Sequence, residues 1–494
     1  MADGFGGTVR PPGVPALRVR PATPRSPEGG RRWSRRAVVP GGLAVLGAPA
    51  VLAACAAPGA PAPPAGEGQG QALSGEVTVM HAGSQPSGEA EARWTRFKGV
   101  FQDRHPRLSL NLVWDPRLYA DRKLEVLMAA DSVPAVASLR RQAEIPRLAY
   151  LQGALPLDPY VNKSVVVKKA DYYDKVLAGH TLDGKLYVVP HDMTLFSLFY
   201  NADAFAQQGL KPPDLTWDYE DWQQAALRLT RTAGGGSSGP RTQFGVEMPS
   251  WWVIHYLGNR GLPLMDGGVG LKPPAQWSVT YDRPETIAGY KWQADQWCRY
   301  ACAAPQPDAG DPSTATEEQM TFERGKAAMR FVDSSAAVGF QERIKEFRWN
   351  VTLPPLGDKR QPRVTTSIGR GYGLMKGARG LDGGWAFIEV YNDPKRFLED
   401  VREAGGGPYG SRAVMESKEY QSSPVPPADK SIWVEGLKTA RFFPEPGWEL
   451  SLVVDTSAVT ANTGDIWLCK ESAEAVLRPY GQQINRLLKE KTGS

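Results

Sequence analysis

The sequence predicts an α/β protein with mostly parallel sheets flanked by helices. From Gly75 onward, short apolar runs typical of strands alternate with longer segments whose apolar residues recur at helical spacing. The 494 residues, with 41% apolar and 22% charged side chains, have an ordinary globular composition and a length that indicates two or more domains. Because such sheets carry sites at the carboxyl ends of their strands, we expect one in the loops at 80–88, 115–117 and 138–142.

Three strand and helix units follow one another after Gly75. In the first helix Trp94, Phe97 and Phe101 recur at helical spacing, and Gly153 stops the third helix. The predicted order is a strand at 77–80, a helix around 94–101, a strand at 108–114, a helix at 118–130, a strand at 133–139 and a helix at 143–152.

The rest of the chain continues the mixture of strands and helices. Asp183 and Gly184 form the two-residue turn of a hairpin, Asp218 is an N-cap with Asp221 at the third helical position, and Pro479 breaks the last helix. The predicted elements are a hairpin at 180–189, strands at 195–200 and 327–332, and helices at 202–208, 218–231, 317–324, 385–391, 394–403 and 465–489.

The net charge of +5 lies in the first 54 residues. That segment carries eight arginines and two acidic residues, so the other 440 residues hold 50 basic and 51 acidic side chains. The body of the protein is neutral, and its composition gives no electrostatic reason to expect a nucleic-acid partner.

The first 54 residues resemble a bacterial export signal. Ser34-Arg35-Arg36 before an apolar run at 37–54 resembles a twin-arginine signal, and Leu52-Ala53-Ala54-Cys55 resembles a lipobox whose cysteine is lipidated. The alternative is one transmembrane anchor or a short buried helix, for which the glycines and prolines of the run are poorly suited. We expect lipidation of Cys55, a Pro/Ala/Gly-rich tether at 55–74, and attachment to the extracytoplasmic face of the plasma membrane.

Three further cysteines lie in the body. Cys298 and Cys302 are four residues apart on one face of a helical segment, and either can pair with Cys469. Simple buried thiols are the other reading, and we expect at least one free buried thiol. No histidine or further cysteine lies nearby in the sequence, so we expect no metal site, and we expect no cofactor.

Several motifs, in order along the chain, resemble the extracellular solute-binding proteins of ABC importers, in the group that binds sugars. The resemblance implies two α/β lobes joined by a multi-strand hinge, closure on a sugar, and docking of a monomer on permease subunits in the membrane. It places the lobes at 75–192 plus 328–382 and at 197–322 plus 385–494. The motifs are Gly153–Asp158, Tyr187–Pro190, Leu198–Phe205, Gly209–Pro213, Thr216–Asp218, Phe322–Met329, Gly371–Leu374, Trp385–Ile388 and Ile484–Leu488.

A sugar site needs flat aromatic surfaces for the apolar ring faces and polar side chains for the hydroxyls. The body holds 14 tryptophans, of which we expect Trp94, Trp222, Trp292 and Trp385 to pack in the core, whereas Trp251 or Trp252 is the expected sugar platform. The candidate ligand-binding residues are His81, Ser84, Trp114, Asp115, Asp192, Trp251, Trp252, Asp333, Ser334, Arg370, Tyr372, Trp448 and, from the resemblance, Tyr409 and Arg412.

We expect no enzymatic activity. Residues 235–239 match G-x-S-x-G, and 234–239 match G-x-G-x-x-G, but both lie in a Gly/Ser loop that follows no strand. The chain contains no P-loop, H-E-x-x-H or C-x-x-C motif. The alternatives are a surface carbohydrate-active enzyme, or the same binding fold used for a non-sugar solute.

Overall fold

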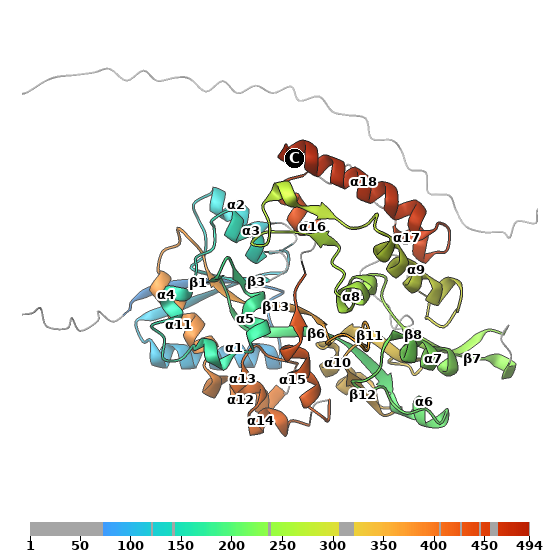
Figure 1. Ribbon diagram of the computed structural model, residues 1–494. Coiled ribbons are helices and arrows are strands. Elements are labelled where there is room, and N and C mark those ends of the chain that lie inside the picture. The colour runs from blue at the N-terminus through green and yellow to red at the C-terminus, as the bar shows by residue number, and fades with distance from the viewer. Residues whose placement is uncertain are drawn as a thin grey trace, which may run out of the picture. The chain divides into compact units, whose positions relative to one another are not determined.

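The computed structural model describes residues 73–119, 122–140, 144–235, 239–305, 321–404, 407–424, 427–443, 446–454 and 463–493. These residues form a mixed sheet in the order β2-β1-β3-β13-β6-β11-β8-β7, with β12 and β14 paired at its middle strands. Figure 1 shows the strands crossing the molecule with helices packed around them. The α/β class expected from the sequence is confirmed, although the sheet is mixed.

One end of the sheet is parallel. β1 (Gly75–Ala82) lies between β2 (Leu108–Asp115) and β3 (Val136–Arg140). Buried Val77, Val79 and Phe97 pack in one core with the buried residues of α11. The helices of this part are α1 (Glu89–Arg104), α2 (Lys123–Ala129), α3 (Glu144–Tyr150), α4 (Asp158–Val161) and α11 (Leu381–Tyr391).

Two long antiparallel strands join the two ends of the sheet. The first half of β6 (Val189–Asn201) pairs with β13 (Thr365–Leu374), and its second half pairs with β11 (Ala327–Asp333) and β12 (Trp349–Thr352). β13 in turn pairs with β3 near its carboxyl end and with β14 (Ala440–Arg441) near its start. β6 and β13 run antiparallel to each other, and they also pair in antiparallel with β3, β11 and β12, which is why the sheet is not parallel throughout.

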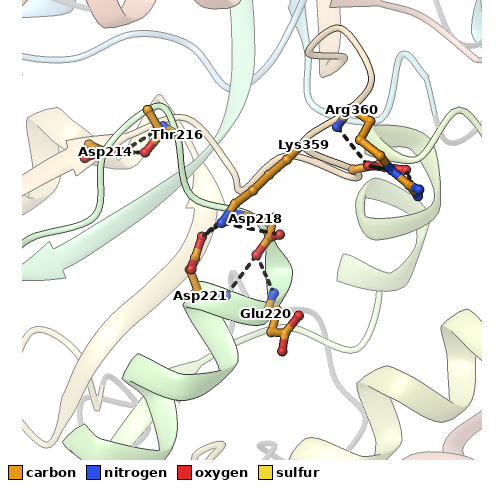
Figure 2. Close-up of polar contacts among 8 residues, drawn as sticks. Asp214, Thr216, Asp218, Glu220, Asp221, Lys359 and Arg360 are labelled. Atoms are coloured by element: carbon orange, nitrogen blue, oxygen red, sulfur yellow. Dashed lines mark hydrogen bonds and ion pairs between the residues drawn. The ribbon is translucent and has the colours of Figure 1, made fainter.

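The other end of the sheet is β8 (Arg241–Glu247), parallel to β11, with β7 (Arg231–Thr232) outside it. α7 (Tyr219–Leu229) packs beside β8, and its N-terminus carries the expected capping box of Asp218 and Asp221. Lys359 Nζ lies 2.6 Å from Asp221 Oδ2, which neutralises part of this acidic cap (Figure 2). The nearby helices are α6 (Ala202–Gln207), α8 (Trp252–Asn259), α9 (Pro284–Cys298) and α10 (Ala336–Arg343).

The remaining elements are short apart from the last helix. Figure 1 shows α18 beside α17 and α9. Within the described residues, every helix is either too short or too polar to cross a bilayer. The remaining elements are β4 (Thr181–Leu182), β5 (Lys185–Leu186), β9 (Met265–Asp266), β10 (Ser278–Val279), α5 (Asp174–Gly179), α12 (Pro394–Ala404), α13 (Arg412–Met415), α14 (Lys418–Gln421), α15 (Ser431–Lys438), α16 (Pro446–Glu449), α17 (Thr463–Trp467), α18 (Ala473–Thr492) and the 3₁₀ turns Lys169–Asp171, Ala233–Gly235, Pro274–Gln276 and Leu450–Leu452.

Several element boundaries differ from the sequence prediction. The final helical segment breaks at 468–472, and α18 runs through Pro479, because buried Leu477, Ile484 and Leu488 hold the helix on both sides of it. The second helix begins at Lys123 rather than 118. The predicted helix at 317–324 lies outside the described residues up to 320, and residues 321–325 form turns.

A disulfide joins Cys298, at the end of α9, to Cys469, just beyond α17, with the two Cα atoms 5.6 Å apart. Cys302 is a buried free thiol. One of the two pairings left open by the sequence is therefore formed, and the expected buried thiol is present. The leader at 1–54, Cys55 and most of the tether at 55–74 lie outside the described residues.

Candidate ligand-binding site

Five of the predicted site residues belong to one cluster at the strand ends. His81 and Trp114 are neighbours in register at the ends of β1 and β2. Tyr372 lies on β13, and the hydroxyl of this residue contacts His81 Nδ1. Arg370 and Asp192 are cross-strand partners on β13 and β6. We call these five residues the strand-end cluster.

A bulge between β13 and β6 sets the register of this cluster. The pairing shifts between Arg370 and Gly371, so that Gly371 lies opposite Pro190. A Cβ atom at Gly371 would lie 2.0 Å from the carbonyl oxygen of Val189, so no other residue fits there without moving the backbone. The glycine therefore allows the close strand contact that positions Arg370 and Tyr372.

Aromatic rings surround His81. Its ring centroid lies 4.4 Å from that of Trp114 and 5.6 Å from that of Trp94, both in edge-on arrangements. Burial, with a smaller contribution from the charge of Arg370, lowers the pKa of His81 to about 4. The imidazole is therefore neutral at pH 7, and the cluster presents an aromatic surface next to polar groups.

The polar half of the cluster is an ion pair. Arg370 Nε donates to Asp192 Oδ2 over 3.0 Å, and the two side chains are 46% and 35% exposed. The charge of Asp192 raises the pKa of Arg370. Burial alone would raise the pKa of Asp192, but His191 and Arg370 more than offset this effect, and the pKa lies below its usual value. Both groups are charged at pH 7 and have hydrogen-bonding capacity left over for a solute.

Tyr119 and Arg140 lie beside the cluster and were not among the residues expected from the sequence. The Tyr119 hydroxyl is 2.8 Å from Ser138 Oγ, and burial raises the pKa of Tyr119 to about 12. Arg140 lies over the Tyr119 ring at 3.8 Å, and its guanidinium donates two hydrogen bonds to Glu144. Arg140 lies within the loop predicted at 138–142, and Tyr119 lies two residues beyond the loop predicted at 115–117, which was the available signal.

The tryptophan pair divides into a core residue and a surface residue. Trp252 is fully buried and stacks on Phe331 with centroids 4.1 Å apart. Trp251 is partly exposed, and its ring lies 5.8 Å from Phe196 and 5.5 Å from His255. The structure corrects the expectation for Trp252, because packing leaves no face of its ring for a solute. Trp251 remains as the candidate platform.

The side chains of Asp333 and Ser334 already accept hydrogen bonds from backbone amides of the protein. Asp333 Oδ1 accepts from the Ser335 amide over 2.9 Å, which closes the turn before α10. Ser334 is 1% exposed, and its Oγ accepts from the amide of Leu195 over 3.1 Å. Ser334 thus fixes the middle of β6 and is too buried to meet a solute directly.

Two predicted residues lie in the loops after β1 and β2. Ser84 is exposed in the loop that follows β1. Asp115 Oδ1 accepts from the Arg117 amide over 2.8 Å, so its carboxylate holds the turn after β2. Both residues lie at the same edge of the sheet as the strand-end cluster.

The segment around Tyr409 reaches the cluster through β6. Tyr409 forms an isolated bridge with Asp192, and its ring centroid lies 6.3 Å from that of His191. The Arg412 side chain contacts Tyr172 and Tyr173 instead of the strand-end cluster. It donates to the carbonyl of Tyr172 over 3.2 Å and lies over the Tyr173 ring at 5.1 Å. That packing corrects the expectation for Arg412.

Trp448 lies in α16, and its side chain is outside what the structure describes.

The family model for bacterial extracellular solute-binding proteins matches residues 85–395 of the chain. A binding protein of Brucella abortus is 24% identical over 425 residues, which cover 84% of this chain and 94% of that protein. Among solved structures, the sugar-binding protein MalE from Xanthomonas citri superposes with a TM-score of 0.65 at 19% identity, over 85% of this chain and 98% of that chain. UgpB from Mycobacterium tuberculosis, in complex with glycerophosphocholine, has a TM-score of 0.65 at 17% identity, over 85% of this chain and all of that chain.

Proposed function

The chain belongs to the bacterial extracellular solute-binding proteins, and on that premise we propose that it captures a sugar or oligosaccharide for an ABC importer. The observation that carries the proposal is the strand-end cluster. Trp114 and the neutral ring of His81 offer aromatic surface, and the Arg370–Asp192 pair beside them offers donors and acceptors together. Sugars combine apolar ring faces with hydroxyls, so this combination suits them.

Capture between two lobes is part of the proposal. β6 and β13 are the strands that connect the parallel end of the sheet with β11 and β8, and we assign them as the hinge. We now assign β11 to the second lobe, because it pairs in parallel with β8. The strand-end cluster then belongs to the first lobe and the hinge, and Trp251 to the second, so that closure would bring both to one solute.

We further propose that the protein is a monomer attached through a lipid on Cys55 to the extracytoplasmic face of the plasma membrane, where it delivers solute to permease subunits. The lipobox and the Pro/Ala/Gly-rich tether support this. Cell fractionation tests it: the wild-type chain should sediment with membranes, and Cys55→Ala should not. Equal distribution of the two would overturn the anchor.

The same fold with a non-sugar solute is the second candidate. The half-exposed Arg370 suits an anionic group, and UgpB, a structural relative, holds glycerophosphocholine. A thermal-shift screen with sugars, polyamines and phosphodiesters separates the candidates, because a bound solute raises the melting temperature. Product analysis of the same mixtures tests our proposal that binding is the whole activity. Turnover of any sugar would overturn it.

A further inference from the structure

A separate cavity of about 570 Å³ lies beside β14. Its walls come from α5 and the following hairpin, from residues 362–364, from Gly270 and Leu271, and from the end of α15 with β14. None of the five residues of the strand-end cluster, and none of the other predicted ligand-binding residues, lines this cavity. The cavity is therefore distinct from the candidate ligand-binding site.

The cavity is lined by positive charge alone. Lys175, Arg363, Lys438 and Arg441 contribute to its walls, and no aspartate or glutamate does. Among the ion pairs of the described part of the chain, none involves any of these four side chains. In a body of near-zero net charge, four basic residues thus contribute to the lining of one cavity.

Part of this charge is fixed and part can adjust. Arg363 donates from Nη1 to the carbonyl of Pro354 and from Nη2 to the carbonyl of Leu215, each over 2.5 Å, so its guanidinium is fixed by two residues behind the cavity lining. Arg441 lies on β14 with its guanidinium over the Phe443 ring at 4.7 Å. Lys175 and Lys438 are exposed, and their flexible stems can bring ammonium groups onto an anion.

We propose that this cavity binds a phosphate group, carried by a soluble phosphate ester or by the headgroup of an anionic lipid. A phosphate offers several strong acceptor oxygens, which can engage donors from different walls of the cavity at once. Lys438 lies in the last turn of α15, and its charge is available because Lys438 has no ion-pair partner among the described residues. The site is independent of the proposed sugar site, since the two share no residue.

The test is a titration of the full chain with inorganic phosphate at low ionic strength, followed by calorimetry. Lys175→Ala/Lys438→Ala should weaken binding about tenfold or more, since each substitution removes a hydrogen bond from a charged donor. The matched control is Lys98→Ala/Lys418→Ala, which removes the same charge from two exposed lysines outside the cavity and should bind phosphate like the wild type. Equal weakening in the two double variants would overturn the site.

Vesicles distinguish the two sources of phosphate. The Cys55→Ala chain is floated with phosphatidylglycerol vesicles and with phosphatidylcholine vesicles. Flotation with the first and not with the second would assign the site to a lipid headgroup, provided that Lys175→Ala/Lys438→Ala abolishes this flotation. Phosphate binding without flotation would assign it to a soluble ester. Absence of both would overturn the proposal. Sugar titrations of the same samples should be unchanged in either double variant, so failure here leaves the proposed function standing.

Discussion

Arg370 on β13 and Asp192 on β6 form a hydrogen-bonded ion pair across the bulge between the two strands, with Nε and Oδ2 3.0 Å apart. The pair lies on the strands that connect the two ends of the sheet and beside the aromatic rings at the ends of β1 and β2. A solute held by this pair would therefore contact the same strands that we assign as the hinge. Binding and closure would be coupled through two side chains.

Replacing Arg370 tests the polar half of the site. Arg370→Ala should lower solute affinity about tenfold or more, because it removes charge-assisted donors. It should change the melting temperature little, since a half-exposed ion pair contributes only about 0–1 kcal/mol. Calorimetry with the solute identified by the thermal-shift screen gives the affinity. Arg360→Ala, which breaks an exposed pair with Asp358, is the matched control and should leave affinity intact.

The two adjacent tryptophans should respond oppositely to substitution. Trp252→Ala should lower the free energy of unfolding by about 3–5 kcal/mol, because it empties a buried site against Phe331. Trp251→Ala should leave stability nearly unchanged and weaken solute binding. Denaturant unfolding and calorimetry on both variants check this. Equal destabilisation by the two substitutions would contradict the assignment of Trp251 to the site.

Stability should fall as the pH drops below about 6.5, and His255 should contribute to the loss. Its ring stacks on Phe196 with centroids 3.4 Å apart, and burial lowers its pKa to about 3. Between pH 6.5 and about pH 3, His255 is protonated in the unfolded chain and neutral in the folded chain. Unfolding therefore becomes more favourable as the pH falls.

The slope of the unfolding free energy against pH measures this proton. His255→Gln removes the titration and should reduce the slope between pH 4.5 and 6.5 by up to about 1.4 kcal/mol per pH unit. Gln can still hydrogen-bond to Thr366 Oγ1, which lies 3.0 Å from His255 Nδ1. At pH 8 residue 255 is neutral in both the wild type and His255→Gln, so the unfolding free energies at this pH serve as the reference. An unchanged slope would show that His255 takes up its proton over the same pH range in the folded and the unfolded chain, and would contradict the prediction.

The strand-end position of the candidate residues was predictable from sequence, because repeated strand and helix units put successive loops at one edge of a sheet. His81 and Trp114 were selected on that basis, and Arg370 was selected because the glycines beside it allow a close approach to a ligand. The burial of Trp252 was not predictable, since it depends on Phe331, which the fold brings beside it from a distant strand. The packing of Arg412 was not predictable for the same reason, because its partner Tyr173 is also distant in sequence.

Local rules also failed where tertiary packing outweighed them. Proline usually breaks a helix, yet Pro479 lies inside α18, where Leu477 and Ile484 are fully buried on either side. Tyr119 was not selected because it lies two residues beyond the loop predicted at 115–117, and a tyrosine has no pattern of its own that marks a site residue. Only its contacts with Ser138 and Arg140 reveal its place beside the cluster.

The disulfide between Cys298 and Cys469 should be a major source of stability. It closes a loop over a sequence separation of 171 residues, and cross-links over long loops restrict the unfolded chain most. Cys298→Ala/Cys469→Ala should therefore lower the free energy of unfolding by about 2–5 kcal/mol. The matched control is Cys302→Ala, which removes a thiol but no cross-link and should cost less.

Thiol titration of the Cys55→Ala chain should find one reactive group, and only in denaturant, because burial raises the pKa of Cys302 to about 11. Three thiols in denaturant without reductant would contradict the pairing.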